Sequence, residues 1–231
     1  YTQLQPYRTW VVKDSGAPIG VSKVFQFKVP AIDKGTKTLA FYSHHQDVVI
    51  YKGDKVIYQR RVYQGNPFGR TSGQGWNDLT LYSEDSGKIL TVVMSPEYST
   101  VQGIDVTFYY GSKIKIWLHD VIRQLAPSIL SLIAIVMGMI FVVFILVNIR
   151  NKKINRNLLF MGIFSICIGV WKITDAGILQ LLFGNNILFS YIPFVSLLLC
   201  VIPFVLFMRT LFTDRAVSYT HLRAHETPEH L

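Results

Sequence analysis

Cysteine is scarce in this sequence, and charge is scarce over its second half. The only cysteines, Cys167 and Cys200, lie in apolar stretches, so no disulfide framework supports the first half and its core must hold it together. Residues 1–121 mix charges, glycines and aromatic residues, as a globular domain does. The charged side chains between Gln124 and Arg209 are Arg150, Lys152, Lys153, Arg156, Lys172 and Asp175. The composition therefore divides the chain near residue 121.

Short motifs of the common catalytic sites are also missing. There is no nucleophile elbow, no histidine-based metal motif and no pair of carboxylates in a shared setting. The glycine-rich stretch 65–75 lacks a following Lys-Ser/Thr pair and a helix, so it is not a phosphate-binding loop. Adjacent residues of a strand point to opposite faces, which disfavours a metal ion shared by His44 and His45. We therefore expect no enzyme active site, metal or cofactor in these residues.

The basic character of the chain does not follow the pattern of a nucleic-acid-binding protein. The formal net charge is +9, from 23 Lys and Arg against 14 Asp and Glu. The basic residues are scattered over the first half and then clustered in one short loop between apolar stretches, rather than placed along one face. We expect no nucleic-acid partner.

What the first half does contain is a series of short strands separated by turns. Val21–Val29 alternates apolar and polar residues, although imperfectly. Gly53 supplies the positive φ that a tight hairpin requires between two further strands. The remaining strands are expected at 38–43, 47–51, 55–59, 79–82, 89–94 and 105–110. This spacing predicts an all-β sandwich or jelly roll over residues 1–121.

Three long apolar stretches in the second half predict membrane helices. Residues 124–149 carry no charge and would form a helix of about 39 Å, which is enough to cross a hydrocarbon core of about 30 Å. Residues 157–183 and 187–208 form the second and third stretches. Pro193 and Pro203 are expected to bend the third helix. The predicted fold is therefore multi-domain, with an α-helical transmembrane bundle over 122–215 after the sandwich.

The loop between the first two predicted helices sets the expected topology. It carries four positive charges and no acid, and its basic residues are Arg150, Lys152, Lys153 and Arg156. By the positive-inside rule this loop is cytoplasmic, so residues 1–121 are expected to be extracytoplasmic. Arg209 and Arg215 follow the third stretch and fall on the same side as the loop, in agreement with this topology.

Two groups of side chains are candidates for signalling or binding. Lys172 and Asp175 are neighbours on one helix face and could form a polar contact that a signal makes or breaks. The alternative is a local ion pair at the outer interface beside Trp171. The candidate ligand-binding residues are His45, with its hydrogen-bonding groups, and the aromatic residues Tyr63, Phe68, Trp76, Tyr98, Tyr109 and Tyr110. Such aromatic faces could stack on a sugar, but in a small sandwich without disulfides they could equally be core.

The end of the chain has an unusual sequence. Val217–Thr227, which reads VSYTHLRAHET, resembles a translated reading frame of the adapter used in transposase-based sequencing libraries. Residues 216–231 are therefore expected to be an artefactual tail, and the histidines at 221, 225 and 230 are not interpreted as a metal site. We expect the natural protein to continue beyond Arg215.

Four sequence segments carry a resemblance to a known family. They read LAFYSHHQ at 39–46, VIYKGDKVIY at 49–58, FGRTSGQGW at 68–76 and YYG at 109–111. As a set they resemble the extracytoplasmic region of membrane-bound GGDEF proteins of clostridia-like bacteria, and Trp171–Asp175 is similar to the second span of that family. The resemblance covers about residues 20–213.

The resemblance implies a sensor region in a bacterial cytoplasmic membrane. The missing cytoplasmic part would be a diguanylate cyclase that makes cyclic di-GMP from GTP, although histidine-kinase or phosphodiesterase outputs remain open. By analogy it implies a homodimer and a small-molecule or carbohydrate ligand outside the cell. No GGDEF residues occur in this sequence. The alternative function is an extracytoplasmic capture domain of a transport or cell-envelope accessory protein.

Overall fold

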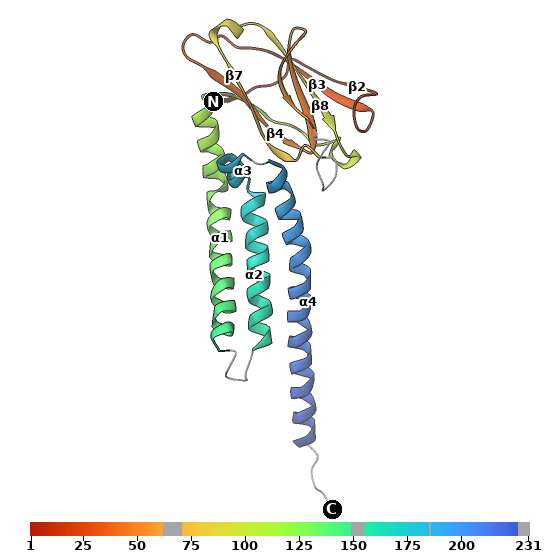
Figure 1. The fold of residues 1–231 in the computed structure, drawn as a ribbon, viewed down its shortest axis with the longest axis vertical. Coiled ribbons are helices and arrows are strands. Elements are labelled where there is room, and N and C mark those ends of the chain that lie inside the picture. Colours follow the sequence, from red (N-terminus) through yellow and green to blue (C-terminus); the bar gives the residue numbers. More distant parts are fainter. Residues whose placement is uncertain (62–70, 149–154, 185, 226–231) are drawn as a thin grey trace, which may run out of the picture. The chain divides into compact units, whose positions relative to one another are not determined.

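The computed structural model describes residues 1–61, 71–148, 155–184 and 186–225 (Figure 1). These residues form two compact units. The first consists of Tyr1–Gln124 and Gly177–Ser190, and the second of Leu125–Ala176 and Tyr191–Leu231. The predicted positions Tyr63, Phe68, Arg150, Lys152 and Lys153 lie outside the described residues.

Two antiparallel sheets make up most of the first unit, which confirms the sandwich-like prediction. The four-stranded sheet has the order β1 (Thr2–Gln3), β9 (Phe108–Gly111), β4 (Lys37–His44) and β7 (Gln74–Leu81). The five-stranded sheet has the order β2 (Arg8–Lys13), β3 (Val21–Lys28), β8 (Ile89–Pro96), β5 (Gln46–Lys52) and β6 (Lys55–Arg60). Two short 3-10 helices, Ser83–Asp85 and Ser99–Val101, lie in the connections.

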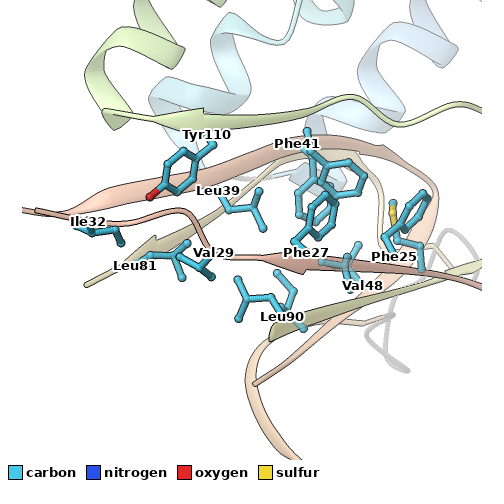
Figure 2. Packing of buried hydrophobic residues seen from close by; sticks show 14 residues of the cluster. Phe25, Phe27, Val29, Ile32, Leu39, Phe41, Val48, Leu81, Leu90 and Tyr110 are labelled. Atoms are coloured by element: carbon cyan, nitrogen blue, oxygen red, sulfur yellow. The ribbon is translucent and has the colours of Figure 1, made fainter. Parts of the chain in front are cut away.

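Aliphatic and aromatic side chains fill the space between the two sheets (Figure 2). Phe108 is at the centre, and its ring centroid lies 5.0 Å from Phe25, 4.6 Å from Phe27 and 4.8 Å from Phe41. These residues come from both sheets, so their packing joins the two layers. Full burial of a phenylalanine contributes about 1.5–3 kcal/mol, which lets this domain form a core without a disulfide.

The strand boundaries correct several predictions from the sequence. β1 and β2 were not expected, because β1 has only two residues and the apolar run Trp10–Val12 of β2 shows no alternation of apolar and polar residues. β7 begins at Gln74 rather than 79, and β9 begins at Phe108 rather than 105. The hairpin between β5 and β6 turns at Gly53 with φ 59°, as the sequence predicted.

In the described part of the chain, four helices follow the strands: α1 (Lys113–Val147), α2 (Arg156–Asp175), α3 (Ile178–Phe183) and α4 (Asn186–His225). Among the described residues, the helices that are long and apolar enough to cross a membrane are Lys113–Val147, Arg156–Asp175 and Ile187–Phe212. This confirms the prediction of three such helices, but their boundaries differ from the predicted ranges 124–149, 157–183 and 187–208. α4 extends into the stretch 216–231, whose adapter origin stays a prediction.

Two helix boundaries differ from the predictions for physical reasons. α1 begins at Lys113 rather than 124, because the absence of charge marks a membrane span and not the start of a helix. The single helix predicted over 157–183 is two helices, α2 and α3. The break is at Gly177, where φ is 77°, a left-handed conformation that commonly ends helices.

In the second unit α1, α2 and α4 run side by side (Figure 1), and α1 packs closely against α2. A Cβ added to Gly138 of α1 would lie 2.6 Å from the carbonyl oxygen of Gly162 in α2. A Cβ added to Gly169 would lie 2.7 Å from the carbonyl oxygen of Ser131. Glycine at these positions therefore lets the two backbones approach, as small residues do between membrane helices.

Candidate functional site

The outer face of the five-stranded sheet carries a groove of about 1040 Å³. β5 and β8 form its floor, because alternate residues of a strand point to opposite sides. Val48 and Ile50 are fully buried in the core, whereas Asp47, Val49 and Tyr51 line the groove. The register pairs Val49 with Val93 and Asp47 with Ser95, so outward side chains of both strands lie together. The volume is close to the upper end, about 1,000 Å³, of the range for small-molecule sites.

The rim of the groove comes from three other segments. The β2–β3 connection contributes Asp14, Gly16 and Pro18, the residue after β6 is Arg61, and the chain leaving β8 contributes Glu97 and Tyr98. Asp14 is fixed in place, because its Oδ1 accepts from the Gly16 amide at 2.9 Å and its Oδ2 from the Ser22 hydroxyl at 2.9 Å. The rim is therefore built mainly from polar groups.

Glu97 has an unusual environment for a carboxylate at the edge of a groove. Its side chain borders the groove, yet the residue is only 8% exposed. Its Oε1 accepts a short hydrogen bond from the Ser72 amide. Its Oε2 is buried and has no hydrogen-bond partner among the described residues. An unpaired buried oxygen is rare in folded proteins, because it loses its hydration without compensation.

His45 lies beside this carboxylate, between β4 and β5. Its amide donates to the Gly73 carbonyl at 3.1 Å, and its own carbonyl accepts from the Glu97 amide at 3.0 Å. Its Nδ1 is 2.7 Å from the Thr71 hydroxyl. Burial lowers the pKa of His45 below its ordinary value, and the negative charge of Glu97 partly offsets this effect. His45 therefore has a hydrogen-bonding environment at a strand end, as the sequence suggested.

A partly buried arginine, Arg60, stabilises the segment 72–73 that contacts Glu97. The guanidinium of Arg60 donates to the carbonyl oxygens of Ser72 and Gly73, both at 2.9 Å. It also lies 3.3 Å from Ser43 Oγ and Asn77 Oδ1, two groups of the four-stranded sheet. Burial lowers the pKa of Arg60. Arg60 thus joins the two sheets at the end where the groove lies.

The structure divides the aromatic residues predicted to bind a ligand into separate groups. Tyr98 is at the groove, 45% exposed, with its ring centroid 5.9 Å from that of His45. Trp76 and Tyr109 belong to the four-stranded sheet and contact each other at 5.9 Å. Tyr110 is a core residue, with 8% exposure. A single aromatic surface containing Trp76, Tyr98 and Tyr109 is therefore not formed.

The four-stranded sheet makes contacts to helical residues of the first unit instead. The indole N–H of Trp76 donates to Asp120 Oδ2 of α1 at 3.0 Å, and Lys113 of α1 forms a close ion pair with Asp78. The Gln74 amide donates to Ser190 Oγ, in the first residues of α4, at 2.8 Å. These contacts tie β7 to the beginnings of two long helices.

Among the helical candidates, Lys172 and Asp175 form a local pair. Lys172 Nζ lies 3.8 Å from Asp175 Oδ2 and 4.0 Å from the ring centroid of Trp171. Both side chains of the pair are about half exposed in a structure without lipid. This geometry agrees with the local alternative named above. Arg156, a topology candidate, is the first residue of α2.

The groove residues Asp14, Asp47, Tyr51, Arg61 and Glu97 were not predicted. Asp47 and Tyr51 alternate outward on β5, a signal that the apolar Val49 between them obscures. Asp14, Arg61 and Glu97 each follow the end of a strand and have no such signal. In the described part of the chain no group of three or more His, Cys, Asp or Glu side chains could hold a metal ion. Comparison with protein-family models and with curated proteins finds no match to this chain.

Proposed function

We propose that this chain is the input region of a bacterial membrane receptor, whose extracytoplasmic sandwich binds a small molecule or carbohydrate. The groove on the five-stranded sheet is the observation that carries the proposal. Its volume, its mixed polar and apolar lining and the incompletely bonded Glu97 suit a small ligand. The three apolar helices suit a multi-pass protein of the cytoplasmic membrane.

The strand order supports a more specific fold for the sensor. Sheets ordered β1-β9-β4-β7 and β3-β8-β5-β6, with β2 added at one edge, have the interleaved neighbours expected of a jelly roll. Lectin domains include jelly rolls, which is consistent with a carbohydrate ligand. Fold alone does not define function, so this point is secondary to the groove.

A short segment connects the groove with a helix end inside the first unit. The Ser72 amide donates to Glu97 at the groove, and two residues later the Gln74 amide donates to Ser190 of α4. A ligand that moves Glu97 would displace this segment and so shift the position of Ser190 and the first residues of α4. Small shifts of this kind are a recognised route for signals between sites.

The proposed output is a cytoplasmic diguanylate cyclase, acting as a homodimer, in the part of the natural protein beyond Arg215. Recovery of the intact gene tests this directly. We expect a GGDEF domain, and we expect membranes containing the whole protein to form cyclic di-GMP from GTP. Ser190→Ala is expected to change the rate of synthesis, and Asp33→Asn, in an exposed turn, to leave it unchanged.

A different gene structure would favour the alternative function. A stop codon soon after Arg215, or a neighbouring permease gene with no output domain in the reading frame, would contradict the receptor proposal. The groove would then serve an accessory protein that captures a substrate for a membrane partner.

A further inference from the structure

The charge of the groove restricts the ligands that it can bind. Among the described lining residues, Asp14, Asp47 and Glu97 supply three carboxylates and Arg61 one guanidinium, which gives these residues a formal charge of −3 + 1 = −2. A negative lining favours a positively charged ligand and disfavours an anion. A nucleotide or a sugar phosphate is therefore a poor candidate for this groove.

Glu97 supplies the specific contact that a general negative charge does not. One oxygen is already bonded to the Ser72 amide, while the buried Oε2 lacks any hydrogen-bond partner among the described residues. A carboxylate oxygen accepts hydrogen bonds only, so its missing partner must be a donor. Hydrogen bonds between an ammonium group and a carboxylate are among the strongest in proteins.

The remaining lining suits the carbon skeleton of such a ligand. Val49, Val93 and Pro18 offer apolar surface, and Tyr51 and Tyr98 offer aromatic rings. Aromatic faces attract cations and also pack against the C–H groups of a small ring or chain. The groove thus combines an acceptor for an ammonium group with apolar walls.

We propose that the groove binds a small organic cation, and that the Glu97 side chain turns its buried Oε2 into the groove to accept a hydrogen bond from a protonated amine of this ligand. The inference rests on the proposed role of the groove as the ligand site and adds the chemical class. An amino sugar and an aliphatic polyamine share this chemistry. Because both sources carry an ammonium group, the probes below include one of each.

The experiment titrates the full chain in detergent micelles with four probes and measures binding by calorimetry. Glucosamine and putrescine carry ammonium groups, whereas N-acetylglucosamine and glucose are neutral. We expect at least one ammonium probe to bind about tenfold or more tightly than both neutral sugars, since loss of a charged hydrogen bond has this size. The preferred ammonium probe distinguishes an amino sugar from a polyamine.

Substitution at Glu97 gives the specific test. Glu97→Gln keeps an oxygen for the Ser72 amide but removes the negative charge. We expect this variant to bind the ammonium probe at least about tenfold more weakly than the wild type. Asp33→Asn removes one charge in an exposed turn outside the groove and serves as the matched control. If Glu97→Gln does not fold, Asp47→Asn, also in the groove lining, takes its place with a weaker expected effect.

Several results would overturn the inference. If neither glucosamine nor putrescine bound more tightly than the two neutral sugars, the amine would not be recognised. Equal weakening by Glu97→Gln and Asp33→Asn would show only general electrostatic attraction, and absence of binding by both ammonium probes would exclude the class. Binding of glucose that Tyr51→Ala abolishes would keep the groove as a ligand site while rejecting the cation. The cyclase assay tests the receptor role separately.

Discussion

The indole N–H of Trp76 and the carboxylate of Asp120 form a hydrogen bond of 3.0 Å that joins β7 to α1. Asp120 is nearly fully buried, and Arg123 also contacts it at 3.3 Å. Trp76 is half-buried, so its indole N–H bears a desolvation cost when it loses this acceptor. The bond is therefore a specific link between the sandwich and the first turns of this helix.

Two substitutions at Asp120 test the strength of this link. Asp120→Ala leaves the Trp76 indole without an acceptor, so we expect a loss of about 1–3 kcal/mol in the free energy of unfolding. Asp120→Asn keeps an acceptor oxygen and should lose less. Thermal unfolding of the full chain, followed by tryptophan fluorescence, measures both. Equal destabilisation by the two variants would show that the hydrogen bond is unimportant.

Arg60 is expected to be essential for the groove end of the sandwich. Arg60→Lys cannot reproduce contacts with the carbonyls of Ser72 and Gly73 together with Ser43 and Asn77. We expect a loss of about 2–4 kcal/mol in the free energy of unfolding, because buried acceptors are left unpaired. Arg8→Lys, on the exposed strand β2, is the control and should change stability by less than about 0.5 kcal/mol.

The stability of the sandwich should depend on pH through His45. Because burial lowers the pKa of His45 in the folded state, the unfolded chain binds more protons between that pKa and the ordinary value. His45 therefore stabilises the fold above about pH 6.5, and this contribution is lost as the pH falls through the lowered folded-state pKa.

Substitution of His45 by asparagine isolates this effect. His45 has a φ of 48°, a left-handed conformation that asparagine tolerates better than most residues. We expect His45→Asn to reduce the loss of stability between neutral and mildly acidic pH, measured by denaturant unfolding at several pH values. Parallel curves for the wild type and the variant would assign the pH dependence to other groups.

The packing of α1 against α2 should be intolerant of any side chain at Gly138. Even a methyl group would lie 2.6 Å from a backbone oxygen of α2, so the helices would have to separate. We expect Gly138→Ala to lose about 1–3 kcal/mol by overpacking. Val136→Leu, at a position 41% exposed on the same helix, adds one carbon without this clash and should have little effect. Thermal stability in detergent compares them.

Chemical labelling can test the proposed topology. In a variant whose natural cysteines are replaced by serine, Asp33→Cys should react with a membrane-impermeant maleimide in intact cells. Asn151→Cys, in the basic segment between α1 and α2, should react only after the membrane is permeabilised, as the positive-inside rule predicts. The reverse labelling pattern would place the sandwich in the cytoplasm.

The sequence predicted local elements well where a local cause determines them. Gly53 marked the β5–β6 hairpin, and the absence of charge marked three long helices. The edge strand β2 was missed because an exposed edge needs no buried face. The predicted second helix is interrupted at Gly177, because this residue has a left-handed backbone conformation. A count of apolar residues does not detect such a break.

The candidate site was much less predictable, because it depends on pairing between distant segments. Glu97 is a single acid after a strand, and its position becomes significant only when β5 pairs with β8. Trp76 and Tyr98 were grouped as aromatic residues, but Trp76 lies in β7 of the four-stranded sheet and Tyr98 follows β8 of the five-stranded sheet. Composition identifies side chains that can bind a ligand, and sheet order determines which of them meet.

The position of β9 between β1 and β4 also affects how the chain folds during synthesis. Gln3 pairs with Tyr109, so the first strand has no neighbour in its sheet until almost the whole sandwich has been made. β9 ends at Gly111, and α1 begins at Lys113. Such distant pairing is slow to form. The sandwich can therefore be completed only as the first apolar helix is produced, which places the two folding events close together in time.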